Sequence, residues 1–144
     1  MNNKDKKFMS LAYEQAKKSK YNRFPMGCVI AYKGHVIGSG HNSNRTDPMQ
    51  KHYNKKRKFN KTSGKPIVHS IHCEIAALKS IPYPIADSID WSKVKVYIYR
   101  ISKGHTLHIG MARCCPACMQ ALRDRGIRKI YYTTNEGYAQ EEIF

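Results

Sequence analysis

Residues 115–133 of the chain read CPACMQALRDRGIRKIYYT. Pro116 suits the first turn of a helix, where its missing N–H is not needed, and Gly126 suits the position just past a helix end. The β-forming run 127–133 then predicts a strand. This stretch therefore predicts a helix that leads directly into a strand, which is a repeating unit of layered α/β proteins.

The same alternation of helix and strand extends towards the N-terminus. Residues 94–101, VKVYIYRI, are nearly continuous in β-forming residues, as expected of a strand that is covered on both faces. Residues 72–82, HCEIAALKSIP, predict a short helix that stops before Pro82. Because successive strands are joined through crossover helices, we expect the later strands to run parallel.

The N-terminal part of the chain predicts a helix followed by a hairpin. Apolar residues at helical spacing in residues 4–19, with lysines on the other face, indicate an amphipathic helix. Residues 26–40, MGCVIAYKGHVIGSG, predict strands near 26–33 and 35–40, with Gly34 supplying the positive φ of a tight turn.

The order of the predicted elements is helix, hairpin, loop, helix, strand, helix, strand, which predicts an α/β fold. The length of 144 residues fits one domain, 1–144. Residues 43–68 lack periodicity and are dense in Lys, Arg, Asn and His, so we expect a basic surface loop there. We expect the last ten residues, NEGYAQEEIF, to form a turn and a short acidic tail.

The composition limits the class of protein and of partner. The chain carries 26 Lys and Arg against 10 Asp and Glu, a formal net charge of +16, so we expect an anionic partner. A hydrophobic content of 41% excludes a disordered basic tail. No apolar stretch approaches the roughly 20 residues that span a bilayer, and no signal-peptide core is present. We therefore expect no membrane contact and a cytoplasmic location.

Cysteine and histidine occur together at two predicted helix starts. Residues 72–74, His-Cys-Glu, open one helix, and residues 115–118, Cys-Pro-Ala-Cys, open the next. The five cysteines, an odd number with two adjacent, favour metal ligands and packing residues over a disulfide framework. Zinc prefers imidazole and thiolate ligands, and a site with three protein ligands keeps its fourth position open for water. The predicted zinc ligands are His72, Cys115 and Cys118.

The order H-x-E followed by C-x-x-C resembles the zinc-dependent cytidine and deoxycytidylate deaminase superfamily, which includes tRNA adenosine deaminases. The resemblance covers most of residues 5–134, because the segments FPMGCVI, VIGSGHN, HCEIAAL and VYIYRI follow the order of that family. It implies a three-layer α/β/α sheet with the zinc site at two helix N-termini. Cys114 stands where the family has Pro, so ligation by Cys114 and Cys118 stays open as an alternative register.

The resemblance implies hydrolytic deamination of a base. Glu74 would take a proton from water, protonate the ring nitrogen beside the reacting carbon, and later help ammonia leave. Asn42 matches the family's asparagine that contacts the base or sugar, although Asn after a strand also commonly shapes a turn. The Cys73 backbone matches the amide that meets the carbonyl of the base.

The basic loop favours a phosphorylated substrate. Residues 43–65 hold eight basic residues and one acidic residue, and Lys and Arg neutralise phosphates. We expect a nucleotide such as dCMP or single-stranded DNA or RNA, and a homo-oligomer, since relatives are often oligomers. Residues 126–132, GIRKIYY, look more like the cytosine branch than the adenosine branch, so we expect cytosine as the base. The predicted phosphate-binding residues are Lys55, Lys56, Arg57 and Lys58.

Two alternatives remain at this point. One is a tRNA adenosine-to-inosine deaminase. The other is a nucleic-acid-binding module with a closed structural zinc site, which would need a fourth ligand, and His69 and Cys114 are the candidates. The second alternative explains the positive charge equally well, but it gives no reason for Glu74 to stand beside a three-ligand site.

Overall fold

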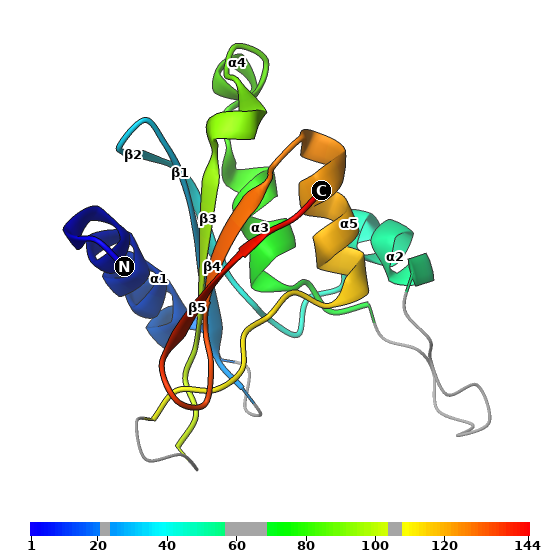
Figure 1. Cartoon of the computed structure of the whole chain (residues 1–144). Helices are drawn as coiled ribbons and strands as arrows, with labels where there is room; N and C mark the ends of the chain where they lie inside the picture. The colour runs from blue at the N-terminus through cyan, green and yellow to red at the C-terminus, as the bar shows by residue number, and fades with distance from the viewer. Residues whose placement is uncertain (21–23, 57–68, 104–107) are drawn as a thin grey trace, which may run out of the picture.

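The computed structural model of the protein describes residues 1–20, 24–56, 69–103 and 108–144. Five strands form one sheet in the order β2-β1-β3-β4-β5 (Figure 1). β3 and β4 run parallel, and the other neighbouring pairs run antiparallel. The strands are β1 (Met26–Tyr32), β2 (His35–His41), β3 (Lys95–Arg100), β4 (Lys129–Thr133) and β5 (Tyr138–Glu142).

The helices lie on both faces of the sheet, so the expected α/β/α arrangement is confirmed (Figure 1). α1 (Asn3–Lys18) covers one face, while α3 (Cys73–Ser80) and α5 (Pro116–Arg125) cover the other. α2 (Pro48–Tyr53) packs beside α5. Shorter elements complete the described chain: η1 (Asn54–Lys56), α4 (Tyr83–Ala86) and η3 (Trp91–Lys93).

β3 is covered on both faces, as its continuous run of β-forming residues predicts. Val96 and Ile98 are buried in the core that the sheet forms with α3 and α5. Tyr97, between them, is buried in the core under α1, because successive side chains of a strand point to opposite faces. Its ring stacks on Tyr131 of β4, and its hydroxyl donates a 2.6 Å hydrogen bond to the buried Asp5 of α1.

α1 lies directly against the backbone of β1 at Gly27. A Cβ atom at this position would stand 2.2 Å from the carbonyl oxygen of Ala12 and 2.3 Å from the nitrogen of Ala16. Only glycine permits this approach. The hairpin between β1 and β2 turns at Lys33 and Gly34, which both have positive φ (49° and 81°), as in a type I′ turn.

Two predictions from the sequence are wrong in part. The segment 43–68 is not a continuous loop, because Asp47 caps α2 and η1 follows it. Residues 57–68 lie outside the described residues. The C-terminal segment is not a tail, because it adds β5 to the edge of the sheet beside β4.

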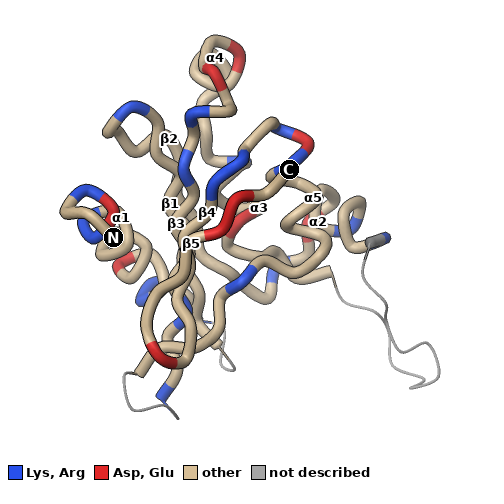
Figure 2. The backbone as a smooth tube through the Cα atoms, viewed as in Figure 1, with Lys and Arg blue, Asp and Glu red and all other residues tan. Residues whose placement is uncertain are grey.

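Within the described residues, charged side chains occur on several elements. Figure 2 shows basic residues on α1 and at the start of β3 and β4, and acidic residues on β5. Within the described ranges, no helix is both long and apolar enough to cross a membrane. One domain over 1–144 stays a prediction.

Candidate active site

Three side chains with zinc-type ligand atoms meet where α3 and α5 begin. His72 is the N-cap residue of α3, Cys115 is the N-cap residue of α5, and Cys118 lies in the first turn of α5. Their ligand atoms all lie within 4.8 Å of one another. The His72 Nδ1 atom is 3.5 Å from the sulfur of Cys115 and 3.3 Å from the sulfur of Cys118.

These distances fit a tetrahedral zinc ion. Zn–N bonds of about 2.0 Å and Zn–S bonds of about 2.3 Å place the nitrogen and a sulfur about 3.5 Å apart. The hydrogen bond from the Cys118 thiol and the neighbouring His72 lower the pKa of Cys115 to about 4, although burial acts in the opposite direction. Cys115 is therefore a thiolate at neutral pH, which is the form that binds metal.

The cluster consists of three ligands in the part of the chain that the structure describes. His69, a candidate for a fourth ligand, instead lies with its Nδ1 atom 2.9 Å from the Asn54 amide nitrogen. Cys114 is buried and is not one of the three clustered residues. Three ligands leave one coordination position for water, the arrangement of catalytic rather than structural zinc sites.

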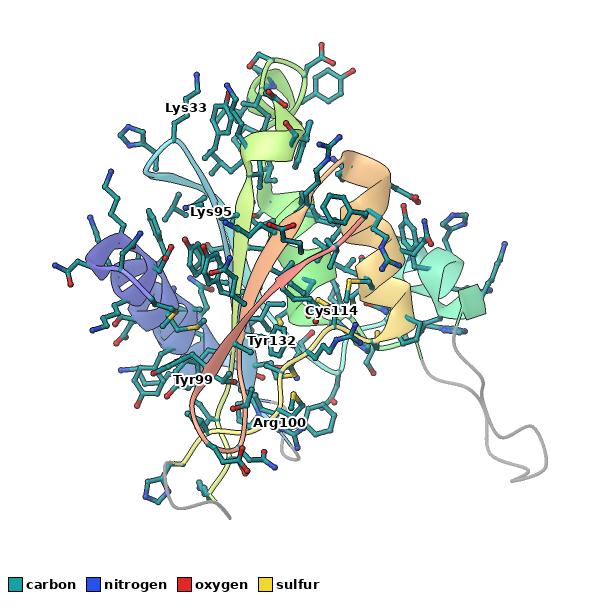
Figure 3. All side chains as sticks on the ribbon, in the orientation of Figure 1. Lys33, Lys95, Tyr99, Arg100, Cys114 and Tyr132 are labelled. Carbon is teal, nitrogen blue, oxygen red and sulfur yellow. The ribbon has the colours of Figure 1, made fainter. Side chains whose placement is uncertain are left out.

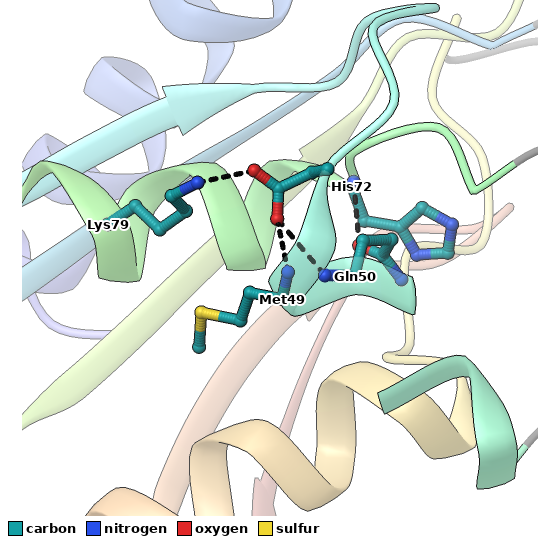
Figure 4. A network of polar contacts seen from close by, with 5 residues as sticks. Met49, Gln50, His72 and Lys79 are labelled. Atoms are coloured by element: carbon teal, nitrogen blue, oxygen red, sulfur yellow. Dashed lines mark hydrogen bonds and ion pairs between the residues drawn. The ribbon is translucent and has the colours of Figure 1, made fainter. Parts of the chain in front are cut away.

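A network of polar contacts from α2 holds the backbone of His72 (Figure 4). Asp47 accepts hydrogen bonds from the N–H groups of Met49 and Gln50 and pairs with Lys79 of α3. The side chain of Gln50 is fully buried, and its Oε1 atom accepts a 3.0 Å hydrogen bond from the His72 N–H. α2 therefore fixes the start of α3, and Gln50 is a positioning residue that the sequence did not reveal.

Glu74 lies in the first turn of α3 and is only 3% exposed. Its Oε1 atom accepts a 2.9 Å hydrogen bond from the Cys73 thiol. Burial raises the pKa of the Cys73 thiol well above the ordinary value, so this thiol stays protonated and donates to the carboxylate. Burial raises the pKa of the neighbouring Cys114 thiol in the same way. Glu74 is not one of the clustered ligand residues, yet it borders the same cavity as His72. It is therefore available for proton transfer.

A cavity of ≈ 210 Å³ opens beside the three-ligand cluster. It has an apolar part, a part that carries the polar groups of the helix starts, and two arginines. The lining residues are Phe24, Met26 and Met111; Asn42, His72, Cys73, Glu74 and Cys115; and Arg100 and Arg113. The two arginines are further residues that the sequence did not single out, because nothing in the local pattern distinguishes them from the other 24 basic residues.

Asn42 lines this cavity, but most of its amide is already bonded within the protein. Its Oδ1 atom accepts hydrogen bonds from the Ser19 hydroxyl at 2.6 Å and from the Met26 N–H at 2.9 Å. Its Nδ2 atom donates to the Phe24 carbonyl at 2.9 Å. An amide offers two acceptor positions and two donor hydrogens, so one N–H of Asn42 is left for a ligand.

Of the four predicted phosphate-binding residues, the structure describes the side chain of Lys55, which is not among the residues that line the cavity. Lys55 is exposed on η1, and Lys56 ends that element. Arg57 and Lys58 lie outside the described residues. Their role in phosphate binding stays a prediction from the sequence.

Comparisons with known proteins agree with this geometry. The family described as "cytidine and deoxycytidylate deaminase zinc-binding region" matches residues 2–134. A search of curated protein sequences found no match.

Among solved structures, a cytidine deaminase from Burkholderia pseudomallei is 15% identical and has a TM-score of 0.59, with 99% of this chain and 94% of that chain covered. An apo dCMP deaminase from the cyanophage S-TIM5 is 18% identical with a TM-score of 0.56, covering 93% of this chain and 86% of that one. The same phage enzyme in complex with dCMP and dUMP has a TM-score of 0.54 at 19% identity, covering 93% and 84%. At these identities the structural likeness shows a shared fold.

Proposed function

This chain belongs to the family of cytidine and deoxycytidylate deaminases, with zinc as its metal, and from that premise we propose that it hydrolyses the amino group of a cytosine base in a phosphorylated substrate. The observation that supports this most directly is a buried carboxylate, Glu74, beside a three-ligand zinc cluster in one cavity. A structural zinc site has four protein ligands, so it leaves no coordination position open for water and needs no carboxylate beside it.

His72, Cys115 and Cys118 hold the zinc in this proposal. When bound, zinc would lower the pKa of its water to about 7 and so supply hydroxide at neutral pH. Gln50 holds the backbone of His72 through the 3.0 Å hydrogen bond, so that the imidazole stays directed at the two sulfurs. The thiolate of Cys115 stands at the positive end of α5, which favours its negative charge.

Glu74 moves the protons of the reaction. It accepts a proton from the attacking water, transfers it to the ring nitrogen next to the reacting carbon, and then assists protonation of the amino group that leaves as ammonia. Water and cytosine are thereby converted into uracil and ammonia. The thiol of Cys73 holds the carboxylate in place through its 2.9 Å hydrogen bond.

The size of the cavity matches a base rather than a whole nucleotide. At ≈ 210 Å³ it lies below the roughly 300–1,000 Å³ of sites that enclose drug-sized ligands. We infer that the base enters the cavity while the sugar and phosphate remain at its mouth. The Cys73 backbone and the remaining N–H of Asn42 are the proposed contacts to the base or sugar. A polynucleotide substrate, homo-oligomerisation and a cytoplasmic location stay predictions.

The proposed activity is tested with the zinc-loaded protein on cytidine, dCMP, a cytosine-containing oligonucleotide and an adenosine-containing RNA loop, with ammonia release as the readout. We expect turnover of a cytosine substrate, and a loss of about 10²- to 10⁴-fold in Glu74→Gln with zinc content unchanged. Glu14→Gln is the matched control, because Glu14 is exposed on α1 and forms its ion pair with Lys17 of the same helix, away from the cavity. Turnover of the adenosine substrate alone would show that the base is adenine rather than cytosine. Bound zinc with no turnover of any of these substrates would favour a nucleic-acid-binding module with structural zinc.

A further inference from the structure

The cavity holds a guanidinium in a fixed position at the end of β3. Arg100 is the last residue of β3 and pairs with Met26, the first residue of β1, so both stand at the end of the sheet where α3 and α5 begin (Figure 3). Arg100 lines the same cavity as His72 and Glu74. It is therefore placed to touch whatever molecule reaches the reactive groups.

Three neighbouring groups orient this guanidinium. Its central carbon lies 4.9 Å from the centre of the Phe24 ring, a cation–π contact. Its Nη1 atom donates a 3.3 Å hydrogen bond to the Met111 carbonyl. On another side Gly110 lies so close that an added Cβ would stand 3.0 Å from the Arg100 Nε and Cδ atoms. A side chain held by an aromatic ring, a carbonyl and a glycine has lost most of its rotational freedom before a ligand arrives.

The positive charge of Arg100 has no carboxylate partner among the ion pairs of the described residues. Its Nε atom is one of two buried side-chain polar atoms that lack a hydrogen-bond partner there. The other arginine of the cavity differs in this respect. Arg113 makes two 2.8 Å hydrogen bonds to Glu141, which also accepts one from the Tyr132 hydroxyl. Within the described ranges, the charge of Arg113 is thus offset by Glu141, whereas that of Arg100 has no carboxylate beside it.

An unpaired, partly buried guanidinium is costly unless a ligand supplies the missing anion. Cytosine and its nucleosides are uncharged, so they cannot supply it. A phosphate group can, and arginine binds phosphate through charge-assisted hydrogen bonds. Among the residues that the structure describes, one such cation stands beside a cavity of base size, which matches a single phosphate rather than the row of cations that a polynucleotide backbone engages.

We infer that Arg100 binds the 5′-phosphate of a cytosine mononucleotide and so selects nucleoside monophosphates over nucleosides. This inference rests on the proposed deaminase function and adds its substrate class. Arg100 acts in binding the substrate and takes no part in proton transfer, so its effect falls on KM for phosphorylated substrates.

The first test compares Arg100→Gln with the native protein in turnover of dCMP and cytidine. We expect kcat/KM for dCMP to fall about 10- to 100-fold, mainly through KM, and the value for cytidine to change less than about threefold. Arg100→Lys keeps the charge but loses the planar donors, so its kcat/KM for dCMP should lie between the values of the native protein and of Arg100→Gln. Arg125→Gln is the matched control, since Arg125 makes a comparable contact with the ring of Trp91 but does not line the cavity. Equal losses for dCMP and cytidine in Arg100→Gln would mean that Arg100 supports only the structure.

The second test separates this inference from the proposed function. Binding of dCMP and cytidine is measured by calorimetry on Glu74→Gln, with and without Arg100→Gln. Tighter binding of dCMP than of cytidine, abolished by Arg100→Gln, supports the inference even if no substrate is turned over. Equal binding of both ligands overturns it even if the protein is an active deaminase. An oligonucleotide without a terminal phosphate should bind equally to both variants, and a decrease there as large as for dCMP would refute the mononucleotide assignment.

Discussion

Substitution of Asn42 by Ala separates a structural role of this residue from a role in substrate binding. Asn42 is only 4% exposed, and its amide joins the end of β2 to the segment that leads into β1. The Oδ1 atom of the same amide also accepts a hydrogen bond from the hydroxyl of Ser19, the C-cap residue of α1. Three parts of the chain therefore meet at one side chain beside the cavity.

The expected loss of stability follows from the groups that the substitution leaves behind. Without the amide, the Met26 N–H loses its 2.9 Å acceptor and the Phe24 carbonyl loses its 2.9 Å donor. The Ser19 hydroxyl keeps its 2.9 Å hydrogen bond to the Asn42 carbonyl, so it adds little to the loss. A buried group without its partner costs about 1–3 kcal/mol, so two such groups cost about 2–6 kcal/mol. This is a large share of the roughly 5–15 kcal/mol that stabilises a typical domain.

The assay is urea unfolding of the zinc-loaded protein, with the free energy of unfolding compared at an unchanged m value. A loss of about 3 kcal/mol corresponds to a decrease in Tm of roughly 10 °C for a chain of this length. Ser19→Ala is the matched control, because Oδ1 of Asn42 then still accepts from the Met26 N–H, and the expected loss is about 1 kcal/mol or less. If Asn42→Ala unfolds at the native urea concentration while KM rises, the amide serves the substrate and the structural reasoning is wrong.

Three further predictions concern the metal, acid stability and surface charge. Cys115→Ala should lose stoichiometric zinc and Cys114→Ala should keep it, as measured by elemental analysis; the reverse would establish the other register. Burial would raise the pKa of Asp47, but hydrogen bonds from Lys79 and from the start of α2 lower this pKa overall. The ionised carboxylate therefore stabilises the fold above about pH 4, and this stabilisation is lost as the pH falls further. Asp47→Asn should flatten the pH dependence of the free energy of unfolding, measured between about pH 5 and 2. Replacing residues 55–58 by Gln should make oligonucleotide binding less dependent on salt, with the slope of log K against log salt smaller by about 0.7 for each phosphate that is no longer bound, and should leave dCMP turnover within about twofold.

Most regular elements follow from the sequence because their residues repeat with a clear period or sit between strong stop signals. Pro116 and Gly126 bound α5 as the pattern at helix ends predicts, and Lys33-Gly34 forms the expected turn. β5 was missed because it is an edge strand whose side chains are half exposed and polar, so its alternation resembles an acidic tail. The sequence pattern did not predict α2, because this helix has only six residues and its buried side chain is a glutamine, Gln50, rather than an apolar residue.

The site was predictable as far as its ligands lie at fixed spacings in the chain. H-x-E and C-x-x-C each place their residues within one turn of a helix start, so the sequence alone brings two of the three ligand-bearing positions close together. Gln50 and Arg100 have no such local signature. Their positions at the site depend on which strand ends and which loop the fold brings beside α3, and only the tertiary structure supplies that.

The net charge of +16 and the charge of Arg100 in the cavity act over different distances. Exposed charges, such as the lysines of α1 in Figure 2, are screened beyond about 8 Å at physiological salt, so they mainly raise the rate at which any anionic ligand arrives. They act on the many phosphates of a long strand rather than on a single phosphate beside the cavity. Arg100 lines the cavity, is partly shielded from solvent and has no carboxylate partner among the described residues, so its interaction with a phosphate is screened far less. The choice of substrate therefore depends on one charge at the cavity rather than on the total charge of the surface, and the effect of Arg100→Gln on dCMP should persist at salt concentrations that abolish oligonucleotide binding.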